Sequence, residues 1–174
     1  MSGQSPTFDG HAARLLLLLL AFRADRKALK GLTKLAKLDF LLRYPVFLER
    51  LLEADSIDWP ENAAPTDAER LEVEEPMIRY KYGPWDQAYY PILGSLISRG
   101  LVKMSSSQRT RTFALTESGK AAAEALAQID AWGLTAARST VLSDHFDLTG
   151  NRLKDRIYEE LPEAVDRPMW EQIR

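Results

Sequence analysis

The sequence predicts a mainly helical fold with a small β hairpin, and three features of its 174 residues support this. Apolar residues recur at three- and four-residue spacing through 32–42, as in a helix that buries one face. Two short β-prone runs flank a polar turn between residues 101 and 115, as in a hairpin. The composition is 45% hydrophobic and 28% charged, which is typical of a chain that buries a core without disulfides.

Helices are predicted for most of the first 54 residues. After a polar tail at 1–8, a leucine-rich helix is expected at 11–24. A second helix follows Gly31, with Lys34 and Lys37 on its wetter side. Tyr44-Pro45 interrupts this helix because the residue before a proline avoids the helical region, and Val46 to Ala54 continues it.

The apolar run Leu15–Leu20 is predicted to be a helix packed in the core. Extended by Ala21 and Phe22 it is about eight residues long, whereas a membrane-spanning helix needs roughly 20. A signal peptide is the alternative, but Asp9 precedes the run and the basic segment before it is thin. The absence of cysteine excludes disulfides, cysteine-based zinc sites and thiol nucleophiles, so a cytoplasmic location is expected.

Residues 55–75 are predicted to form an acidic insertion. Pro60 and Pro65 break this stretch, and a helical turn is expected to begin at Thr66. A run of acidic side chains is usually a solvated surface, with a docking surface for a basic partner as the alternative.

A strand and a helix are predicted next. Met77 to Tyr82 alternates as a strand does, and Gly83-Pro84 ends it. Asp86 can cap the following helix, which stops at Arg99-Gly100. One face of this helix is expected to carry Tyr90, Leu93, Leu96 and Ile97.

The hairpin completes a recognisable order of elements. Strands are expected at 101–104 and 109–115 around a polar turn at 105–108, and Thr116 caps the next helix. Two helices followed by strand, helix, hairpin and helix is the order of a winged helix-turn-helix. Further helices are expected at about 135–146 and 151–160.

The predicted organisation is therefore a mainly α fold with a small β wing: a winged helix-turn-helix with extra N- and C-terminal helices. A flexible tail occupies 1–8, and the winged-helix domain occupies 9–130 with the acidic insertion at about 55–75. Residues 131–174 form a C-terminal helical extension.

The hairpin and the helix before it hold the candidate binding residues. Flexible cations at a hairpin or on a helix face suit DNA phosphates, and the candidates are Lys103, Arg109, Arg111, Lys34 and Lys37. The helix from Trp85 to Ser98 has no basic residue, so nearby aromatic residues are assigned to a partner interface: Tyr80, Tyr82, Trp85, Tyr89 and Tyr90. Solvated faces are the alternative for both sets. The net charge of −2 restricts any DNA contact to a local patch.

Residues that could carry catalysis are few. His11 and His145 are the only histidines, and neither has a helical partner four residues away that would form a metal site. A surface or structural role explains Asp144-His145-Phe146-Asp147 better than a ligand set does. No phosphate-binding loop, dinucleotide fingerprint or nucleophile elbow is present. The sequence predicts that the protein is not an enzyme and has no metal, cofactor or small-molecule substrate.

Several of these segments together resemble one known family. They are Leu32–Pro45, Arg79–Asp86, the Gly-Leu-Val that starts the hairpin, and Thr149–Tyr158. Over residues 12–160 the pattern is similar to the middle component of ABC-three-component systems, the group that includes the small subunit of Lamassu-type bacterial defence. The resemblance implies a non-catalytic accessory subunit of an SMC- or Rad50-like ATPase complex that also holds an effector, often a nuclease, and acts against phage or plasmids. Double-stranded DNA is a further candidate partner, and the resemblance supplies no catalytic residue.

A stand-alone, dimeric winged-helix transcriptional regulator is the alternative. Such a regulator should have a basic recognition helix, which is absent here, and a symmetric dimerisation helix, which residues 117–160 could contain.

Overall fold

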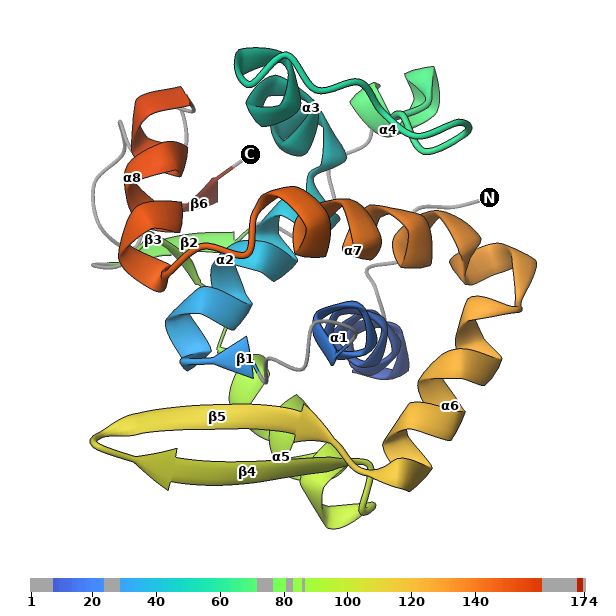
Figure 1. Cartoon of the computed structure of the whole chain (residues 1–174), viewed down its shortest axis with the longest axis vertical. Coiled ribbons are helices and arrows are strands. Elements are labelled where there is room, and N and C mark those ends of the chain that lie inside the picture. The colour runs from blue at the N-terminus through green and yellow to red at the C-terminus, as the bar shows by residue number, and fades with distance from the viewer. Residues whose placement is uncertain are drawn as a thin grey trace.

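The computed structural model describes residues 8–23, 29–71, 77–80, 83–85, 87–160 and 172–173. These residues are mainly helical, with two small antiparallel sheets of three strands each (Figure 1). In chain order the elements are α1 Phe8–Arg23, β1 Leu29–Lys30, α2 Leu32–Arg43, α3 Pro45–Ala54, α4 Asp67–Leu71, β2 Met77–Tyr80, β3 Gly83–Trp85, α5 Tyr89–Ser98, β4 Val102–Ser107, β5 Thr110–Leu115, α6 Glu117–Ala127, the 3₁₀ turn η1 Asp130–Trp132, α7 Gly133–His145, α8 Gly150–Glu160 and β6 Gln172–Ile173.

Helix α1 lies at the centre of the fold because it is apolar on nearly every side. Leu15 to Leu19 are all buried, which confirms that this run packs in the core. Figure 1 shows α1 nearly end-on, with α7 on one side and strands β4 and β5 on the other, and both α7 and β5 contact it. No helix in the described ranges is long and apolar enough to cross a membrane.

The predicted break between the second and third helices is confirmed. Tyr44 leaves the helical region with φ −125° and ψ 72°, and Pro45 is the first residue of α3. Proline suits that position because its missing amide hydrogen would have no helical partner there. The break turns the chain so that the rings of Phe40, Tyr44 and Phe47 pack together, with centroids 5.2 to 5.8 Å apart.

The hairpin sheet has the strand order β1-β5-β4, with Leu29 of β1 opposite Phe113. Strand β4 runs to Ser107 instead of the predicted 104, because the turn consists of Gln108 and Arg109, with φ 49° and 69°. Two consecutive residues with positive φ are typical of the tight turn that joins twisted strands. The predicted turn at 105–108 is wrong because both faces of this protruding hairpin meet solvent, so polar Ser105 to Ser107 can extend a strand.

The second sheet has the order β3-β2-β6. Strand β2 ends at Tyr80, and the last two residues of the predicted strand, 81 and 82, lie outside the described residues. Asp86 also lies outside them, and α5 has Ala88 at its N-cap with no side-chain hydrogen bond. The predicted tail lies outside the described residues except for Phe8, which begins α1.

The C-terminal helices belong to the same hydrophobic core as the rest of the chain. Val141, Leu142 and Phe146 of the α7 region and Leu153 and Ile157 of α8 are buried in the core cluster. Residues 131–160 therefore share one core with the predicted winged-helix domain at 9–130.

The acidic insertion is tied to helix α7. Thr66 and Glu69 form the predicted N-terminal turn of α4, where each side chain accepts a hydrogen bond from the other residue's backbone amide. Arg138 of α7 donates to both Glu69 carboxylate oxygens, at 2.6 and 2.8 Å, and to the carbonyl oxygen of Ala63 at 2.9 Å. The Arg138 guanidinium lowers the pKa of Glu69. An insertion that looks wholly solvated in sequence is therefore attached firmly to α7, and Asp55 and Arg70 add ion pairs to Arg156 of α8 and Glu49 of α3.

Gly119 packs against the base of the hairpin, and we expect Gly119→Ala to lower the free energy of unfolding. Its amide donates to the Thr116 hydroxyl at 2.9 Å, and a methyl group at Gly119 would lie 1.8 Å from the carbonyl oxygen of Leu101. Because that oxygen belongs to the backbone, the clash should cost at least about 2 kcal/mol of unfolding free energy. Urea denaturation measures it. Gly133→Ala is the matched control, since nothing lies within 4 Å there, and equal losses in both variants would contradict the close packing.

Candidate functional site

The surface formed by α5 and the hairpin is basic in an otherwise acidic chain. Residues 87–116 carry Arg99, Lys103, Arg109 and Arg111 and no acidic residue, whereas the whole chain has a net charge of −2. All four side chains are exposed. We call them the basic surface. Arg99 was not among the predicted DNA-binding residues, although the net charge counted in a sliding window includes it.

The hairpin register shows how three of these cations are arranged. Lys103 lies opposite Ala114, on the face turned away from the core. Arg111 lies opposite Ser106, on the face whose inner members Val102 and Phe113 are buried. Arg109 stands at the turn. Of the three predicted DNA-binding residues of the hairpin, Arg109 and Arg111 therefore lie toward its outer end and Lys103 near its base, and they do not form one flat patch.

Helix α5 has one buried and one exposed face, and the division differs from the prediction. Tyr89, Ile92, Leu93 and Leu96 are buried, but Tyr90 is 57% exposed and Ile97 is 37% exposed. Tyr90 and Ile97, predicted to share a face with the two leucines, point to solvent instead. Tyr90 thus remains a candidate for a partner interface.

Tyr89 was predicted to contact a partner, and this is wrong because its ring is 1% exposed. Its hydroxyl donates to Asp39 of α2 at 2.6 Å, and Arg14 of α1 donates to the same carboxylate. Arg14 in turn contacts the His11 ring at 2.9 Å. These groups form a buried polar network that joins α1, α2 and α5.

Electrostatics explains why the network stays charged. Burial alone would raise the pKa of Asp39, but the Arg14 guanidinium, with further help from Arg43 and from hydrogen bonds, holds that pKa below its usual value. Burial and the adjacent Asp39 carboxylate raise the pKa of Tyr89 well above its usual value. Tyr89 therefore stays a hydrogen-bond donor to an ionised carboxylate.

The lysines of α2 were predicted to lie on its wetter side and to bind DNA, and the structure places both inside. Lys34 pairs with Asp147 at 2.6 Å, and its side chain is 12% exposed. Lys37 is 2% exposed and donates to the carbonyl oxygen of Gly150 at 3.2 Å. The prediction of a solvent-exposed face is wrong because α8 covers the face of α2 that carries these lysines. Neither ammonium group can reach a phosphate while α8 is packed there.

The structure does not test three of the remaining candidates, and it groups the others into no site. The strands β2 and β3 hold the backbones of Tyr80 and Trp85, whose side chains lie outside the description, as does Tyr82 entirely. His11 belongs to the buried network and His145 is exposed. No group of three or more histidine, aspartate or glutamate side chains in the described residues could hold a metal ion.

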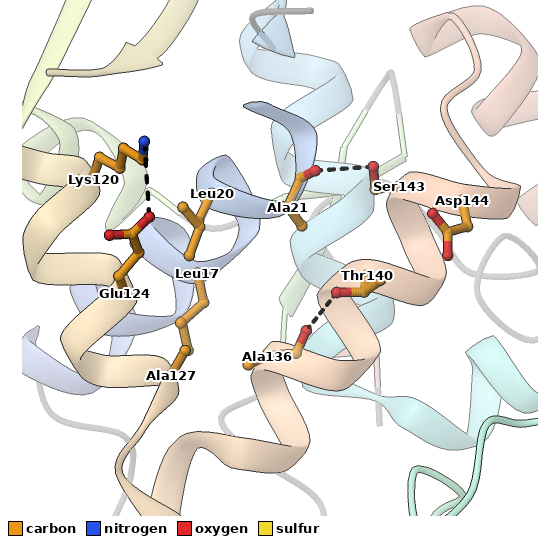
Figure 2. Close-up of a pocket in the computed structure, with 10 residues that line it drawn as sticks. All are labelled: Leu17, Leu20, Ala21, Lys120, Glu124, Ala127, Ala136, Thr140, Ser143 and Asp144. Carbon is orange, nitrogen blue, oxygen red and sulfur yellow. Dashed lines mark hydrogen bonds and ion pairs between the residues drawn. The ribbon is translucent and has the colours of Figure 1, made fainter. Parts of the chain in front are cut away.

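A pocket of about 570 Å³ opens between α1, α6 and α7 (Figure 2). Leu17, Leu20 and Ala21 form its floor, and the rim carries Lys120, Glu124, Ala127, Ala136, Thr140, Ser143 and Asp144. The two hydroxyl groups donate to helix carbonyl oxygens, Ser143 to Ala21 and Thr140 to Ala136. Lys120 lies 3.9 Å from Glu124. This arrangement contains no nucleophile paired with a base.

The buried network predicts that removing the hydroxyl group destabilises the protein at one of two neighbouring tyrosines and not at the other. Tyr89→Phe keeps the ring but leaves the buried Asp39 carboxylate one donor short, which should cost about 1–3 kcal/mol of unfolding free energy. Tyr90→Phe, on the exposed face, should change it by less than about 0.5 kcal/mol. Urea denaturation of the two variants compares them directly, and similar losses would refute the assignment of Tyr89 to the network.

Lys37 should make stability rise with pH in the alkaline range. Burial, and secondly the charge of Lys154, lower the pKa of Lys37 to about 8 from 10.5. Between these values the unfolded chain binds more protons than the folded one, so the free energy of unfolding increases with pH. From pH 7.5 to 9.5 the wild type should gain about 2 kcal/mol relative to Lys37→Met, measured by urea denaturation. Parallel pH profiles of the two proteins would contradict a buried, charged Lys37.

No family model matches the sequence, and neither a curated protein nor a solved structure matches the chain. The basic surface and the exposed side chains of α5 are the features that bear on function.

Proposed function

We propose that the protein is a non-catalytic winged-helix subunit that docks on an SMC- or Rad50-like ATPase in bacterial defence against phage or plasmids, and that its hairpin contacts the DNA backbone. The observation that carries the DNA-contacting part is the basic surface, four exposed cations on α5 and the hairpin with no acidic residue among them. The ATPase, the effector and the defence role come from the family resemblance of the sequence.

The order and pairing of the elements support the winged-helix interpretation. Helix α1 leads into β1, which pairs with β5, and α2 follows at once. Helix α5 directly precedes the β4–β5 hairpin, as a recognition helix precedes its wing. The segment from α3 to β3 is then an insertion between the two helices of the helix-turn-helix.

The positions of the cations favour backbone contact over reading of bases. Arg109 at the turn and Lys103 and Arg111 on the two faces can reach phosphates on either side of the hairpin. The exposed residues of α5 are Tyr90, Pro91, Gly94, Ile97 and Ser98. None of them forms the two-point hydrogen bond with a base edge that arginine or asparagine forms. Binding without sequence preference suits an accessory subunit better than a stand-alone regulator.

Charge reversal on the hairpin tests the DNA contact. Arg109→Glu with Arg111→Glu should weaken binding to a duplex of about 20 base pairs at least about tenfold, and should flatten the salt dependence of the affinity by about two phosphate contacts. Fluorescence anisotropy at several salt concentrations measures both. Arg50→Glu with Arg152→Glu is the control, since both residues are exposed on other elements and the net charge changes equally. Equal affinities for the two double variants would reject a DNA-facing hairpin.

The partner assignment needs its own test. The tagged protein, purified gently from cells that express it naturally, should bring down a coiled-coil ATPase in stoichiometric amount. A homodimer alone that binds one duplex sequence selectively would establish the regulator instead.

A further inference from the structure

Helix α5 has a largely apolar face that is exposed to solvent. Tyr90, Gly94 and Ile97 follow one another at four- and three-residue spacing and share the solvent side of the helix. Met104 of the adjoining strand β4 is 46% exposed and lies on the hairpin face whose inner part packs in the core. We call these four residues the apolar patch.

Gly94 is the informative member of the patch. A glycine inside a helix costs roughly 0.5–1 kcal/mol relative to alanine, so its presence calls for a reason. At Gly119 the reason is the Leu101 carbonyl oxygen, but a methyl group at Gly94 would meet no atom within 4 Å. Nothing within the described chain therefore requires glycine there. The open space leaves a notch between Tyr90 and Ile97 where a second backbone can come close to α5.

The charges beside the patch indicate what fits it. Arg99 follows the end of α5, and Arg111 shares the hairpin face of Met104. Both are exposed, and residues 87–116 contain no carboxylate that would neutralise them. A complementary surface is apolar in the middle and negative at its edges.

We propose that the apolar patch docks one amphipathic helix of a partner protein, whose apolar ridge crosses α5 at Gly94 and whose acidic side chains face Arg99 and Arg111. This rests on the proposed function as a docking subunit and names the surface and the chemistry of that contact. An amphipathic helix laid on an apolar surface is a recurrent mode of recognition.

Two other occupants fit less well. A second copy of this chain would pair the patch with itself across a two-fold axis, which brings the same cations of both copies together. DNA would find no hydrogen-bonding side chain among Tyr90, Gly94 and Ile97 that suits a base edge, apart from one tyrosine hydroxyl.

The test uses Gly94 because it can be changed without disturbing the fold. Gly94→Gln fills the notch, and Gly94→Ala is the matched control that adds only one methyl group. Both variants should be as stable as the wild type or slightly more so, because the site is open and helical. The full chain and both variants are immobilised and offered a displayed library of helical peptides of about 20 residues, with leucine at every third or fourth position and glutamate, lysine or serine at the flanks.

Glutamate-flanked peptides should dominate the peptides that wild type recovers, and Gly94→Gln should lower their binding at least about tenfold while Gly94→Ala lowers it much less. Recovery of lysine-flanked or unbiased peptides, no recovery above background, or equal binding by Gly94→Gln would overturn the proposal. A duplex affinity that falls in Gly94→Gln as far as in the hairpin double variant would assign the face to DNA instead and also overturn it. DNA binding is tested by the double variant at Arg109 and Arg111, and peptide binding by the variants at Gly94. A hairpin that fails to bind DNA therefore does not affect the conclusion about the apolar patch.

Discussion

A fully buried carboxylate determines how the helices of this protein meet. Asp39 of α2 is bound by Arg14 of α1 and by the Tyr89 hydroxyl of α5, so three helices share one charged centre. Such a carboxylate is tolerated in a core only while its hydrogen-bonding partners stay in place. The network therefore specifies which way α5 is turned, since only one orientation brings Tyr89 to Asp39. Its neighbour Tyr90 is directed to solvent for the same reason.

The interaction surface follows from that orientation. Helix α5 ends at Ser98, and Gly100, with a φ of 71°, lets the chain turn straight into the hairpin. Where the hairpin ends, the Thr116 hydroxyl donates to the Gly100 carbonyl oxygen at 2.6 Å, and Gly119 lies against Leu101. These contacts fix the base of the hairpin, and therefore the direction in which it leaves α5. A preorganised surface of this kind loses less entropy on binding than a mobile one.

The lysines of α2 show that cations in this chain serve two different purposes. Lys34 and Lys37 attach the α8 region to α2 through Asp147 and Gly150, and helix α8 packs on the same core as α1. The cations of α5 and the hairpin have no acidic residue near them in sequence and remain exposed. Other cations that are exposed are Lys30, Arg50, Arg70 and Arg152. The surface of α5 and the hairpin differs from theirs because residues 87–116 contain no carboxylate, although the chain as a whole is slightly acidic.

Local chemistry was sufficient to predict most elements, because each depends on neighbouring residues: the periodic helices, the break at Pro45, the stop at Gly100 and the cap at Thr116. Three features depended on distant partners. Adjacent tyrosines look alike in sequence, and only Asp39 selects Tyr89 for the core. Lys37 looks solvated until α8 covers it, because a lysine stem can lie in an apolar contact. The third feature is the candidate interface, of which the sequence predicted only a part. The hairpin cations can be identified from neighbouring residues, but which face of α5 is exposed depends on the distant residues that bury its other face.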